Sequence, residues 1–495
     1  MAVQSIPPQQ GDAASQKAKP SMTPEQIAIV KSTAPILKEH GVTITSHFYS
    51  TMLDAHPALH NIFNRANQAT GDQPRALAGL VFAFASHVDN LAVLEAGIRR
   101  VAHKHVSLQV QPDQYAIVGE YLIAAVAHVL GPDVVTAAVA DAWIAAYAVL
   151  ADIFISLEAD LYRANQDRTD PEGHRVWPAE GGWRPFKIQR RVDESGDAGI
   201  ASFYLVPAPQ DGGADSETQP PLPAFKPGQY ISLRIPVPEL GGVLQPRQYS
   251  LSDAPGKAHY RISVKRERGA AQEQDQEPLH PGGLVSNILH DKYREGDIVE
   301  LTYPMGEFHP TTTGTTTAEA VKPLVLISAG VGVTPMVSIL DTAVLGSTGG
   351  DALQQQKALQ RRPVTWIHGA HSASARAFHE HVAQTLASAA TTTTAEGEQR
   401  EISSHLFLTI PDDSSSSSSS EAEAAASRQH NYTGRIDLAK IPQGRGGLYL
   451  DQPTAAAEYY ICGPLGFMDA ARAYLVEEKG VDEARVFREV FGTGN

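Results

Sequence analysis

The sequence predicts three consecutive domains: an all-α domain, an antiparallel β domain and a doubly wound α/β domain. Its 495 residues suit about three domains of ordinary size. Apolar residues recur at helical spacing up to about residue 165 and alternate at strand spacing after residue 183. In the last third, a continuous apolar strand runs directly into a Gly-rich loop and a helix. We therefore place the domains at residues 22–165, 180–312 and 320–495.

Composition narrows the class of protein. Apolar residues make up 42% of the chain, enough for sizeable cores, and the net charge of -15 argues against a nucleic-acid-binding surface. Cys462 is the single cysteine, which excludes an internal disulfide and a multi-cysteine metal site and predicts a reducing compartment, the cytoplasm. Residues 1–21 lack the apolar segment of a secretory signal and the arginines of a transit peptide. We expect them to form a disordered N-terminal extension.

Helical periodicity organises the first domain. Thr23-Pro24-Glu25-Gln26 predicts a helix start with a capping box, followed by an apolar stripe over residues 27–37. A second helix is expected over residues 44–52, and Gly71-Asp72-Gln73-Pro74 begins a further helix. No strand pattern occurs before Trp183, so the domain is predicted to be all α.

The most apolar long stretch of the chain is residues 134–157. Asp141 and Asp152 interrupt it at a spacing that places both carboxylates on one helix face. This pattern predicts an amphipathic buried helix and argues against a membrane span.

One histidine of the helical domain is a candidate metal ligand. His105 continues an apolar stripe over residues 94–101 and is expected to face the interior, whereas His103 lies half a turn away and is expected to face water. Tyr115 and Glu158 lie on the apolar faces of later helices. A lone buried histidine is usually a satisfied core residue. A histidine in a hydrogen-bonded chain with a phenol and a carboxylate gains basicity and suits haem iron.

The β domain carries a candidate flavin cradle in the sequence Arg247-Gln248-Tyr249-Ser250, between strands at residues 230–235 and 260–265. Arginine can fork onto a phosphate, a tyrosine ring can lie on an isoalloxazine, and a hydroxyl can bond a ring nitrogen. By itself the motif is also compatible with an ordinary strand. Residues 282–287 predict a short helix whose free N–H groups and Ser286 hydroxyl suit a pyrophosphate, or a plain turn with an N-cap.

A nucleotide-type loop marks the third domain. The buried parallel strand at residues 324–327 is followed by Gly330-Val331-Gly332-Val333-Thr334-Pro335. We expect Thr334 to cap a helix and Pro335 to occupy its first turn. The motif departs from the G-x-G-x-x-G fingerprint, so spacing alone does not identify a dinucleotide site.

The rest of this domain follows a strand–helix alternation, with further strands expected at 364–368, 405–410 and 458–461. Cys462-Gly463-Pro464 ends the last of these at the carboxyl edge, where ligands bind in such sheets and where small residues let a nicotinamide approach. Cys462 alone reads as an ordinary buried thiol. Low-complexity segments near 389–400 and 411–430 are expected to be disordered insertions.

Several motifs together resemble the flavohaemoglobin family. His47-Phe48-Tyr49, Ile62-Phe63-Asn64, Gly71-Asp72-Gln73, Lys104-His105 and Asp141-Ala142-Trp143 occur in the order and spacing of its globin domain. Phe225-Lys226-Pro227-Gly228-Gln229-Tyr230 and the motifs at 247–250 and 330–332 fit its reductase part. The resemblance covers residues 23–493 apart from the insertions, which suggest a fungal-type member. It implies a globin, an antiparallel FAD-binding β-barrel and a doubly wound nucleotide-binding domain of the ferredoxin-reductase type.

The resemblance also implies roles for residues around a haem b. His105 would be the proximal iron ligand, with Tyr115 and Glu158 as its hydrogen-bonded relay. The distal face, where dioxygen binds, would be lined by Tyr49, Gln73 and Leu77, and Phe63 would pack on the porphyrin. Lys104 and Glu489 would tune the redox potentials of the cofactors.

For the other two ligands, the resemblance implies contact residues in the second and third domains. Those for FAD are Tyr230, Arg247, Gln248, Tyr249, Ser250, Gly283, Ser286, Val490, Phe491, Gly492 and Thr493. Those for NADH or NADPH are Gly330, Val331, Gly332, Val333, Thr334, Pro335, Cys462, Gly463 and Pro464. Phe491 is expected to cover the flavin ring until the nicotinamide displaces it. Val490 stands where relatives often carry cysteine, so its role does not follow from the motif.

The activity that the resemblance implies is nitric oxide dioxygenation. NAD(P)H would reduce FAD, FAD would pass single electrons to haem, and dioxygen held at the haem would convert nitric oxide to nitrate. Two alternatives stay open: a globin that binds or senses oxygen or lipid and is kept reduced by its reductase part, and a flavin domain that reduces hydroperoxides or ferric iron. The expected partners are small molecules, namely O2, nitric oxide and NAD(P)H, for a monomer without stable membrane insertion. No residue distinguishes NADH from NADPH.

Overall fold

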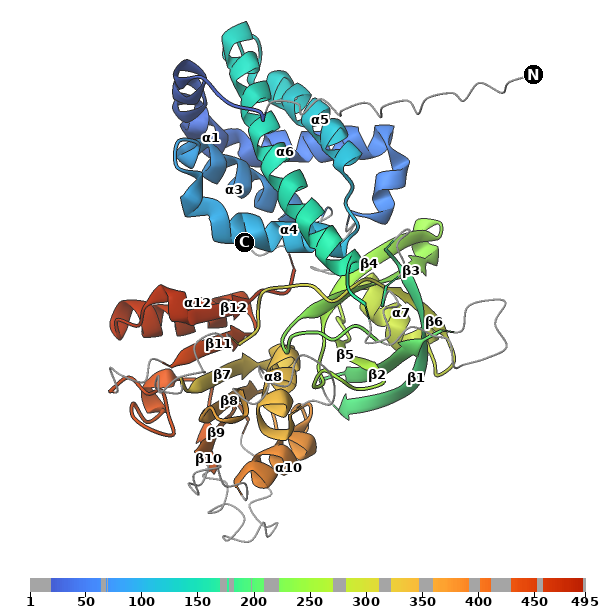
Figure 1. Ribbon diagram of the computed structural model, residues 1–495, viewed down its shortest axis with the longest axis vertical. Coiled ribbons are helices and arrows are strands. Elements are labelled where there is room, and N and C mark those ends of the chain that lie inside the picture. The colour runs from blue at the N-terminus through green and yellow to red at the C-terminus, as the bar shows by residue number, and fades with distance from the viewer. Residues whose placement is uncertain are drawn as a thin grey trace, which may run out of the picture.

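The computed structural model describes most of the chain in three parts. Helices form one end of the molecule, and a β-barrel and an open sheet lie side by side at the other end (Figure 1). The described residues are 19–63, 68, 70–169, 176–177, 182–196, 198–208, 222–269, 282–310, 322–346, 359–390, 401–410, 429–451 and 457–492. Most of the N-terminal extension, most of both insertions, Asn64 and Thr493 lie outside these residues. The domain limits at 165, 180, 312 and 320 remain predictions.

The first part is all α, as predicted. Its elements are α1 (Pro24–Ala55), η1 (Pro57–Asn61), α3 (Asp72–His87), η2 (Leu91–Leu94), α4 (Glu95–Ser107), α5 (Pro112–Leu130) and α6 (Ala137–Gln166). The capping box at the start of α1 is confirmed, because Thr23 accepts from Gln26 N and the Gln26 side chain accepts from Thr23 N. Among the described residues, the first strand begins at Arg184.

The prediction of two separate helices over residues 24–52 is wrong. α1 is one helix of 32 residues that continues through Pro35 and Gly41. An interior proline costs a helix about 3 kcal/mol, but the buried stripe along α1 offsets this cost. Gly41 serves packing: a Cβ there would lie 3.2 Å from the Ala78 Cβ, so the glycine lets α1 and α3 cross closely.

The long apolar helix α6 satisfies, by length and composition alone, the requirements for crossing a membrane. It packs against α1, α4 and α5 and buries Ala142, Trp143, Ala146 and Phe154. These contacts make it a core helix of the helical domain, in line with the prediction.

The second part is the predicted antiparallel barrel. Its elements are β1 (Arg184–Ser195), β2 (Ile200–Pro207), β3 (Tyr230–Val237), η4 (Pro238–Leu240), β4 (Val243–Ser250), β5 (Tyr260–Lys265), α7 (Leu284–Lys292) and β6 (Ile298–Leu301). The strand order is β4-β3-β6-β1-β2-β5, and an antiparallel bridge between Leu251 and Ile262 joins the two outer strands. The register places Tyr230 opposite Ser250. The flavin-cradle motif therefore lies on a strand paired with the strand that begins at Tyr230.

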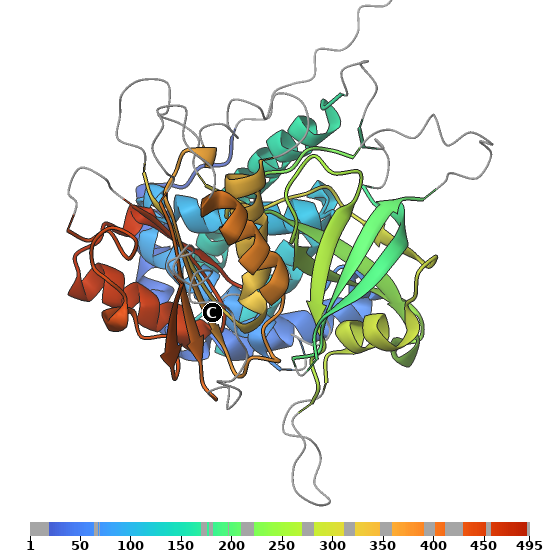
Figure 2. The same cartoon turned by 90° about the horizontal axis from the view of Figure 1, so that it is seen from below.

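The third part is a parallel sheet with helices on both faces, as predicted. Its elements are β7 (Leu324–Ala329), η5 (Gly330–Gly332), α8 (Val333–Leu345), β8 (Val364–Ala370), α10 (His379–Ala390), β9 (Ile402–Leu408), β10 (Gln429–Thr433), η7 (Leu438–Lys440), β11 (Glu458–Cys462), α12 (Leu465–Arg472), η8 (Ala473–Glu478), η9 (Glu483–Arg485) and β12 (Val486–Glu489). The order is β10-β9-β8-β7-β11-β12, with α8 and α10 covering one face and α12 the other (Figure 2).

Described elements overlap the edges of the two predicted insertions, whose extent stays a prediction. α10 extends to Ala390, within the expected 389–400 loop, and β10 begins at Gln429, within the expected 411–430 loop. Low complexity locates such a segment but not its ends, because a flanking turn of helix or strand shares its small and polar residues.

Candidate functional site

Three side chains from three helices meet around His105. The Tyr115 hydroxyl on α5 donates to Glu158 Oε1 on α6 at 2.6 Å. His105 Nδ1 on α4 lies 2.8 Å from Glu158 Oε1 and 2.9 Å from the Tyr115 oxygen. Glu158 is buried, with 3% of its surface exposed. The predicted grouping of these three residues is thus present, and Phe154 packs its ring against both His105 and Tyr115.

The triad fixes which imidazole nitrogen carries the proton. A carboxylate only accepts hydrogen bonds, so Nδ1 of His105 is the donor to Glu158 and Nε2 keeps its lone pair. Nε2 has no hydrogen-bond partner among the described residues. Burial raises the pKa of the Tyr115 hydroxyl, and the Glu158 carboxylate raises it further, so the phenol stays neutral. The resulting imidazole is a basic nitrogen ligand held in one orientation.

Apolar side chains surround the site of His105. Buried apolar side chains of the helical domain form two clusters, one containing Tyr49 and the other containing Tyr115 and Phe154. Leu94 and Leu150 are half-buried and contact both clusters. The His105 side chain is 32% exposed, although its stripe faces the interior. An imidazole that packs against apolar rings, with Nε2 as its available ligand atom, has the chemistry that haem iron needs in a protein ligand.

The predicted distal residues lie in the first of these clusters. Tyr49 on α1 is buried and packs edge-on against Phe63, with ring centroids 5.6 Å apart. Burial raises the pKa of the Tyr49 hydroxyl, and a hydrogen bond from the Gln73 side chain acts in the opposite direction. Gln73 Oε1 accepts from Gln68 at 2.8 Å, which orients the Gln73 amide group toward the phenol. Leu77 is half-buried beside this cluster.

The prediction that His103 faces water is wrong. Its side chain is 13% exposed, and its Nδ1 accepts from the Gly306 N–H of the barrel at 3.3 Å. One turn earlier, Arg99 donates twice to Glu307 at 2.9 and 2.6 Å. The helical spacing correctly predicted that His103 points away from His105. The second domain, and not water, lies on that side of the helix. The helix that carries His105 is therefore docked directly onto the barrel.

These docking residues had no signal in the sequence. Arg99, His103 and Glu307 are ordinary polar residues of helix and loop, and the pairs join positions more than two hundred residues apart. A second contact is similar: Asn61 Oδ1 accepts from Leu244 N at 2.9 Å, and Gln245 Nε2 donates to His60 O at 2.8 Å. Only a covariation signal between the two regions could have located them.

Lys104 and Glu489 approach each other from the first and third domains. The Lys104 ammonium donates to the carbonyl of Gly492 in the C-terminal segment. Burial lowers the pKa of Lys104, and the Glu489 charge partly offsets this. Burial also raises the pKa of Glu489 to about 7, against the opposing effect of Lys104 and Arg100. Both residues are thus sensitive to charge at the junction of the three domains, which suits the proposed redox-tuning role.

Five of the predicted flavin residues lie on two adjacent strands. Arg247 and Tyr249 alternate on one face of β4, while Gln248 and Ser250 alternate on the other. Tyr230 begins β3 and is buried, and its hydroxyl has a hydrogen bond with Ser107 of the helical domain. Arg247 is half-buried, and within the described part of the chain its guanidinium donates to the adjacent Pro246 carbonyl at 2.7 Å and to no other group. This leaves further donors of the guanidinium for a phosphate.

The Gly283–Ser286 loop caps α7, as predicted. Gly283 is the N-cap, and the Ser286 hydroxyl donates to Gly283 O at 3.1 Å and accepts from Glu267 N at 3.2 Å. A Cβ on Gly283 would lie 2.7 Å from the Ser286 oxygen, so a larger residue would have to displace the Ser286 hydroxyl. The helix start offers backbone N–H groups for an anion.

The C-terminal segment follows β12. Val490 is half-buried, Phe491 is 43% exposed, and Gly492 has a φ of 104°, a backbone conformation that favours glycine. Thr493 lies outside the described residues. Phe491 therefore presents a large apolar ring at the surface, as a residue that covers a bound flavin ring would.

The predicted nucleotide loop lies at the carboxyl edge of the parallel sheet. β7 ends at Ala329, Gly330–Gly332 form a short 3-10 turn, and α8 begins at Val333. The expectation that Thr334 caps this helix is wrong. Its hydroxyl donates back to Val331 O at 3.1 Å, and Gly332 holds the N-cap position. A glycine at the cap places no side chain at the start of the helix, so a ligand could approach the backbone N–H groups there.

Cys462-Gly463-Pro464 lies against this loop. β11 ends at Cys462, Pro464 precedes α12, and a Cβ on Gly332 would lie 2.2 Å from the Cys462 carbonyl oxygen. Cys462 is fully buried, and burial raises the pKa of its thiol. A buried neutral thiol is a poor nucleophile. The segment therefore lies with its backbone against the predicted nucleotide loop.

Comparisons with known proteins cover nearly the whole chain. The sequence profile of the globin family matches residues 46–154. A flavohemoprotein from Bordetella pertussis is 40% identical over 96% of this chain and 99% of its own, and one from Deinococcus radiodurans is 41% identical over 95% and 97%. The crystal structure of a flavohemoglobin from Malassezia yamatoensis with bound FAD and heme is 27% identical, with a TM-score of 0.68, over 95% of this chain and 99% of that one.

Fold, site and relatives define a class of protein: an NAD(P)H-dependent oxidoreductase that joins a haem globin to a flavin reductase module. More narrowly, the chain belongs to the flavohaemoprotein family, and haem and FAD are its cofactors. The predicted family, fold class and cofactors are confirmed. The fungal-type assignment stays a prediction.

Proposed function

We propose that this protein is a nitric oxide dioxygenase, which uses electrons from NAD(P)H to convert nitric oxide and dioxygen to nitrate. The observation that carries the proposal is the pair of polar groups in the apolar distal cluster, the Tyr49 hydroxyl and the Gln73 amide. Two hydrogen-bond donors among apolar side chains would stabilise a dioxygen that bears partial negative charge.

On the proximal side, His105 would hold the iron through Nε2, while Glu158 and Tyr115 hold the proton on Nδ1. Haem supplies dioxygen binding and one-electron chemistry when bound. The negative charge of Glu158, paired through Nδ1, makes the imidazole a stronger electron donor than a histidine bound to a backbone carbonyl. Leu77 and Phe63 would exclude water from the distal side and orient the reactants.

On the reductase side, the residues of this chain bind and orient. Arg247 and the start of α7 would hold the pyrophosphate of FAD, and Tyr249 would lie along the flavin ring. The Gly330–Gly332 loop would receive the pyrophosphate of NAD(P)H at the start of α8. Lys104 bridges from the helix of His105 to the C-terminal segment, so the flavin and haem sites share a wall.

Two other functions use the same domains: oxygen or lipid sensing by the globin, and reduction of hydroperoxides or ferric iron by the flavin domain. Tyr49 and Gln73 provide donors for dioxygen, which a lipid site or a flavin-only reaction would not need. An oxygen sensor would need the same donors, and it differs from a dioxygenase in forming no nitrate. A cytoplasmic, monomeric protein acting on small molecules is part of the proposal.

The test is a product balance. The protein loaded with haem and FAD is supplied with NAD(P)H, oxygen and nitric oxide, and nitric oxide consumption is followed with an electrode while nitrate and oxidised nicotinamide are quantified. We expect nitrate to account for nearly all the nitric oxide consumed, and consumption to stop when oxygen is removed. Nitric oxide that persists in the presence of the reduced, oxygenated protein would rule out the dioxygenase. Faster turnover with hydroperoxide or ferric chelates would favour the flavin-domain alternative.

Replacing Tyr49 with phenylalanine is expected to speed the release of oxygen from the reduced protein about tenfold, because one hydrogen bond worth about 1.4 kcal/mol is lost. Stopped-flow displacement of oxygen by carbon monoxide gives the rate. Tyr121→Phe on α5, whose ring packs only edge-on against His56 among the described aromatic contacts, is the matched control. Equal release rates for Tyr49→Phe and the parent would remove Tyr49 from the distal role.

A further inference from the structure

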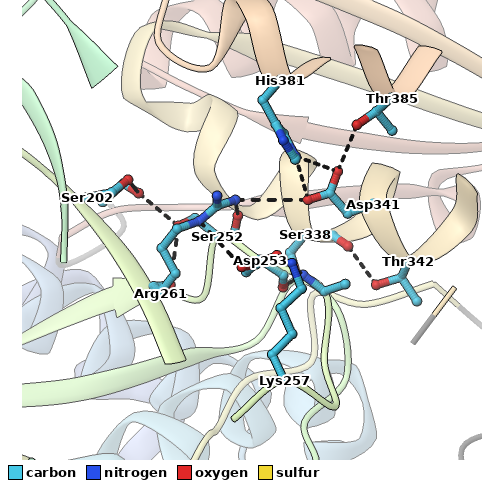
Figure 3. Close-up of polar contacts among 12 residues, drawn as sticks. Ser202, Ser252, Asp253, Lys257, Arg261, Ser338, Asp341, Thr342, His381 and Thr385 are labelled. Atoms are coloured by element: carbon cyan, nitrogen blue, oxygen red, sulfur yellow. Dashed lines mark hydrogen bonds and ion pairs between the residues drawn. The ribbon is translucent and has the colours of Figure 1, made fainter. Parts of the chain in front are cut away.

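A buried cluster of charged and hydroxyl side chains joins the barrel to the nucleotide-binding sheet (Figure 3). We name it the interdomain clasp and define it as Ser252, Asp253, Arg261, Ser338, Asp341 and His381. None of these residues belongs to the cofactor contacts described above. Asp253, Arg261 and Asp341 are at most 5% exposed.

The barrel side of the clasp is built on Arg261 of β5. Its guanidinium donates to the carbonyl of Ser252 and, through Nε, to the Ser252 hydroxyl at 3.3 Å. The carboxylate of Asp253 lies 4.0 Å from Arg261 and also accepts from Lys257 at 2.5 Å. His259 Nε2 lies 3.2 Å from the same carboxylate. The charge of Asp253 is therefore matched within the barrel.

The clasp crosses to the third domain in three places. The Ser338 hydroxyl on α8 donates to the Asp253 carbonyl at 2.7 Å. Arg261 Nη2 lies 3.9 Å from Asp341 Oδ2, also on α8. The same guanidinium stacks over the ring of Phe378, 5.1 Å from its centroid. Arg261 thus faces one carboxylate of its own domain and one carboxylate and one ring of the other.

Asp341 has its own support within the third domain. It is fully buried, and both of its oxygens lie 2.8 Å from Nε2 of His381 on α10. Because a carboxylate only accepts, Nε2 of His381 carries a hydrogen. The Thr385 hydroxyl lies 3.4 Å from the same carboxylate. Asp341 is therefore held in a fixed position for Arg261.

The clasp lies close in sequence to both halves of the reductase site. Ser252 and Asp253 follow the flavin-cradle strand β4 after one intervening residue, Leu251. Ser338 and Asp341 are on α8, which begins directly after the Gly330–Gly332 loop. Two short, rigid segments connected through buried polar contacts thus link the cradle of the flavin to the loop for the nicotinamide nucleotide.

Stability alone does not explain such a cluster. Replacing a buried ion pair by apolar residues of similar volume is often neutral or stabilising, whereas removing one partner is costly. A hydrogen bond across a domain boundary does fix orientation, because it has a narrow range of distances and angles, and Ser338 makes one to the Asp253 carbonyl. The ion pair between Arg261 and Asp341, at 3.9 Å, adds attraction between the same two segments. Orientation between these two domains is what transfer between nicotinamide and flavin requires.

We propose that Arg261 and Asp341 are positioning residues that set the geometry of hydride transfer from NAD(P)H to FAD. In that step the C4–H bond of the nicotinamide breaks with both electrons, and an N–H bond forms at N5 of the flavin. The nicotinamide is oxidised, the flavin is reduced, and solvent supplies the second proton of the reduced flavin. The proposal depends only on flavin reduction, so it stands or falls independently of nitric oxide chemistry.

The test uses Asp341→Asn in the full-length protein with haem and FAD bound. Flavin reduction by NAD(P)H, followed anaerobically by stopped flow, is expected to slow about tenfold or more, since misplacement by about 1 Å can cost a hundredfold. The isotope effect with nicotinamide deuterated at C4 is expected to increase, because the transfer itself becomes more limiting. Nicotinamide affinity should change less than about twofold. Electron transfer from chemically reduced flavin to haem should be unchanged.

A second measurement does not depend on the loaded enzyme. In FAD-free protein, hydrogen–deuterium exchange is expected to become faster in residues 251–265 and 333–345 of the Asp341→Asn variant, and not in α4. The matched control is Glu458→Gln, which neutralises a carboxylate that is equally buried but pairs within the third domain, with Arg362 at 2.8 Å. We expect this control to lower the unfolding temperature without changing the isotope effect.

Ser338→Ala is the second variant, used also if Asp341→Asn does not fold. It leaves all charges in place and removes only the hydrogen bond to the Asp253 carbonyl. It should show a smaller slowing of flavin reduction in the same direction. Parent-like rates and isotope effects in the folded variants, or equal slowing in Glu458→Gln, would overturn the proposal and leave the clasp a structural contact.

Discussion

Replacing His105 with alanine is expected to release haem and leave FAD in place. Nε2 is the nitrogen of the triad that is left for the iron, because Nδ1 is held by Glu158 and Tyr115. Loss of a partner that only orients a ligand already lowers metal affinity about 10- to 100-fold, so loss of the ligand itself should cost more. The haem-to-flavin ratio in the absorption spectrum of the purified variant measures this directly.

The matched control is His128→Ala, which removes an exposed imidazole of α5 that stacks on His47. It should keep haem at the parent level. Added imidazole is expected to restore part of the haem in His105→Ala, since the small ligand can occupy the space that the side chain leaves. Full haem occupancy in His105→Ala without imidazole would mean that another residue binds the iron.

The features predicted correctly from the sequence are those that depend on local periodicity. The apolar stripe through residues 94–101 predicted that His105 faces the interior. The apolar faces of α5 and α6 predicted the same for Tyr115 and Glu158, which are buried. Tyr115 and Glu158 are buried, and buried polar groups in native proteins are nearly always hydrogen-bonded, here to each other and to His105. The triad is therefore a consequence of helix geometry combined with the need to satisfy buried polar atoms.

The features missed depend on what covers a surface. Periodicity correctly predicted that His103 points away from His105. It does not predict whether water or another domain covers that side of the helix, which here faces the loop at Gly306 and Glu307. The clasp has the same origin: Arg261 and Asp341 occupy positions on a strand and a helix where a charged residue is unremarkable. Arg261 and Asp341 come together only when the two domains pack, so the local sequence around each residue does not predict the contact.

Helix boundaries failed for a related reason. Pro35 and Gly41 are local signals for ending a helix, but a continuous buried stripe on both sides of them keeps α1 intact. At Thr334 the local signal for a cap was also strong, yet Gly332 holds the N-cap because the Cys462 backbone lies where a side chain would be. In both places tertiary packing outweighs propensity.

The close approach at Gly332 leads to a large predicted effect. Gly332→Ala should slow flavin reduction by NAD(P)H about a hundredfold while leaving haem and FAD bound. The φ of -60° at Gly332 suits alanine, so backbone strain is not the cause. A Cβ would lie 2.2 Å from the Cys462 oxygen and 2.7 Å from Gly463 N, so the two walls of the nucleotide site must separate. Overpacking of this kind costs about 1–3 kcal/mol in stability.

Anaerobic stopped-flow reduction measures the defect, and dithionite separates it from damage to the cofactors, since it should still reduce both flavin and haem. Gly466→Ala is the matched control: it lies in α12, has no heavy atom within 4 Å of the added Cβ, and should be neutral or slightly stabilising. Normal flavin reduction in Gly332→Ala would mean that the nicotinamide does not bind between the 330–332 loop and Cys462. Slow reduction confined to Gly332→Ala would locate hydride delivery at this edge of the sheet, because the two substitutions add the same methyl group to the same domain.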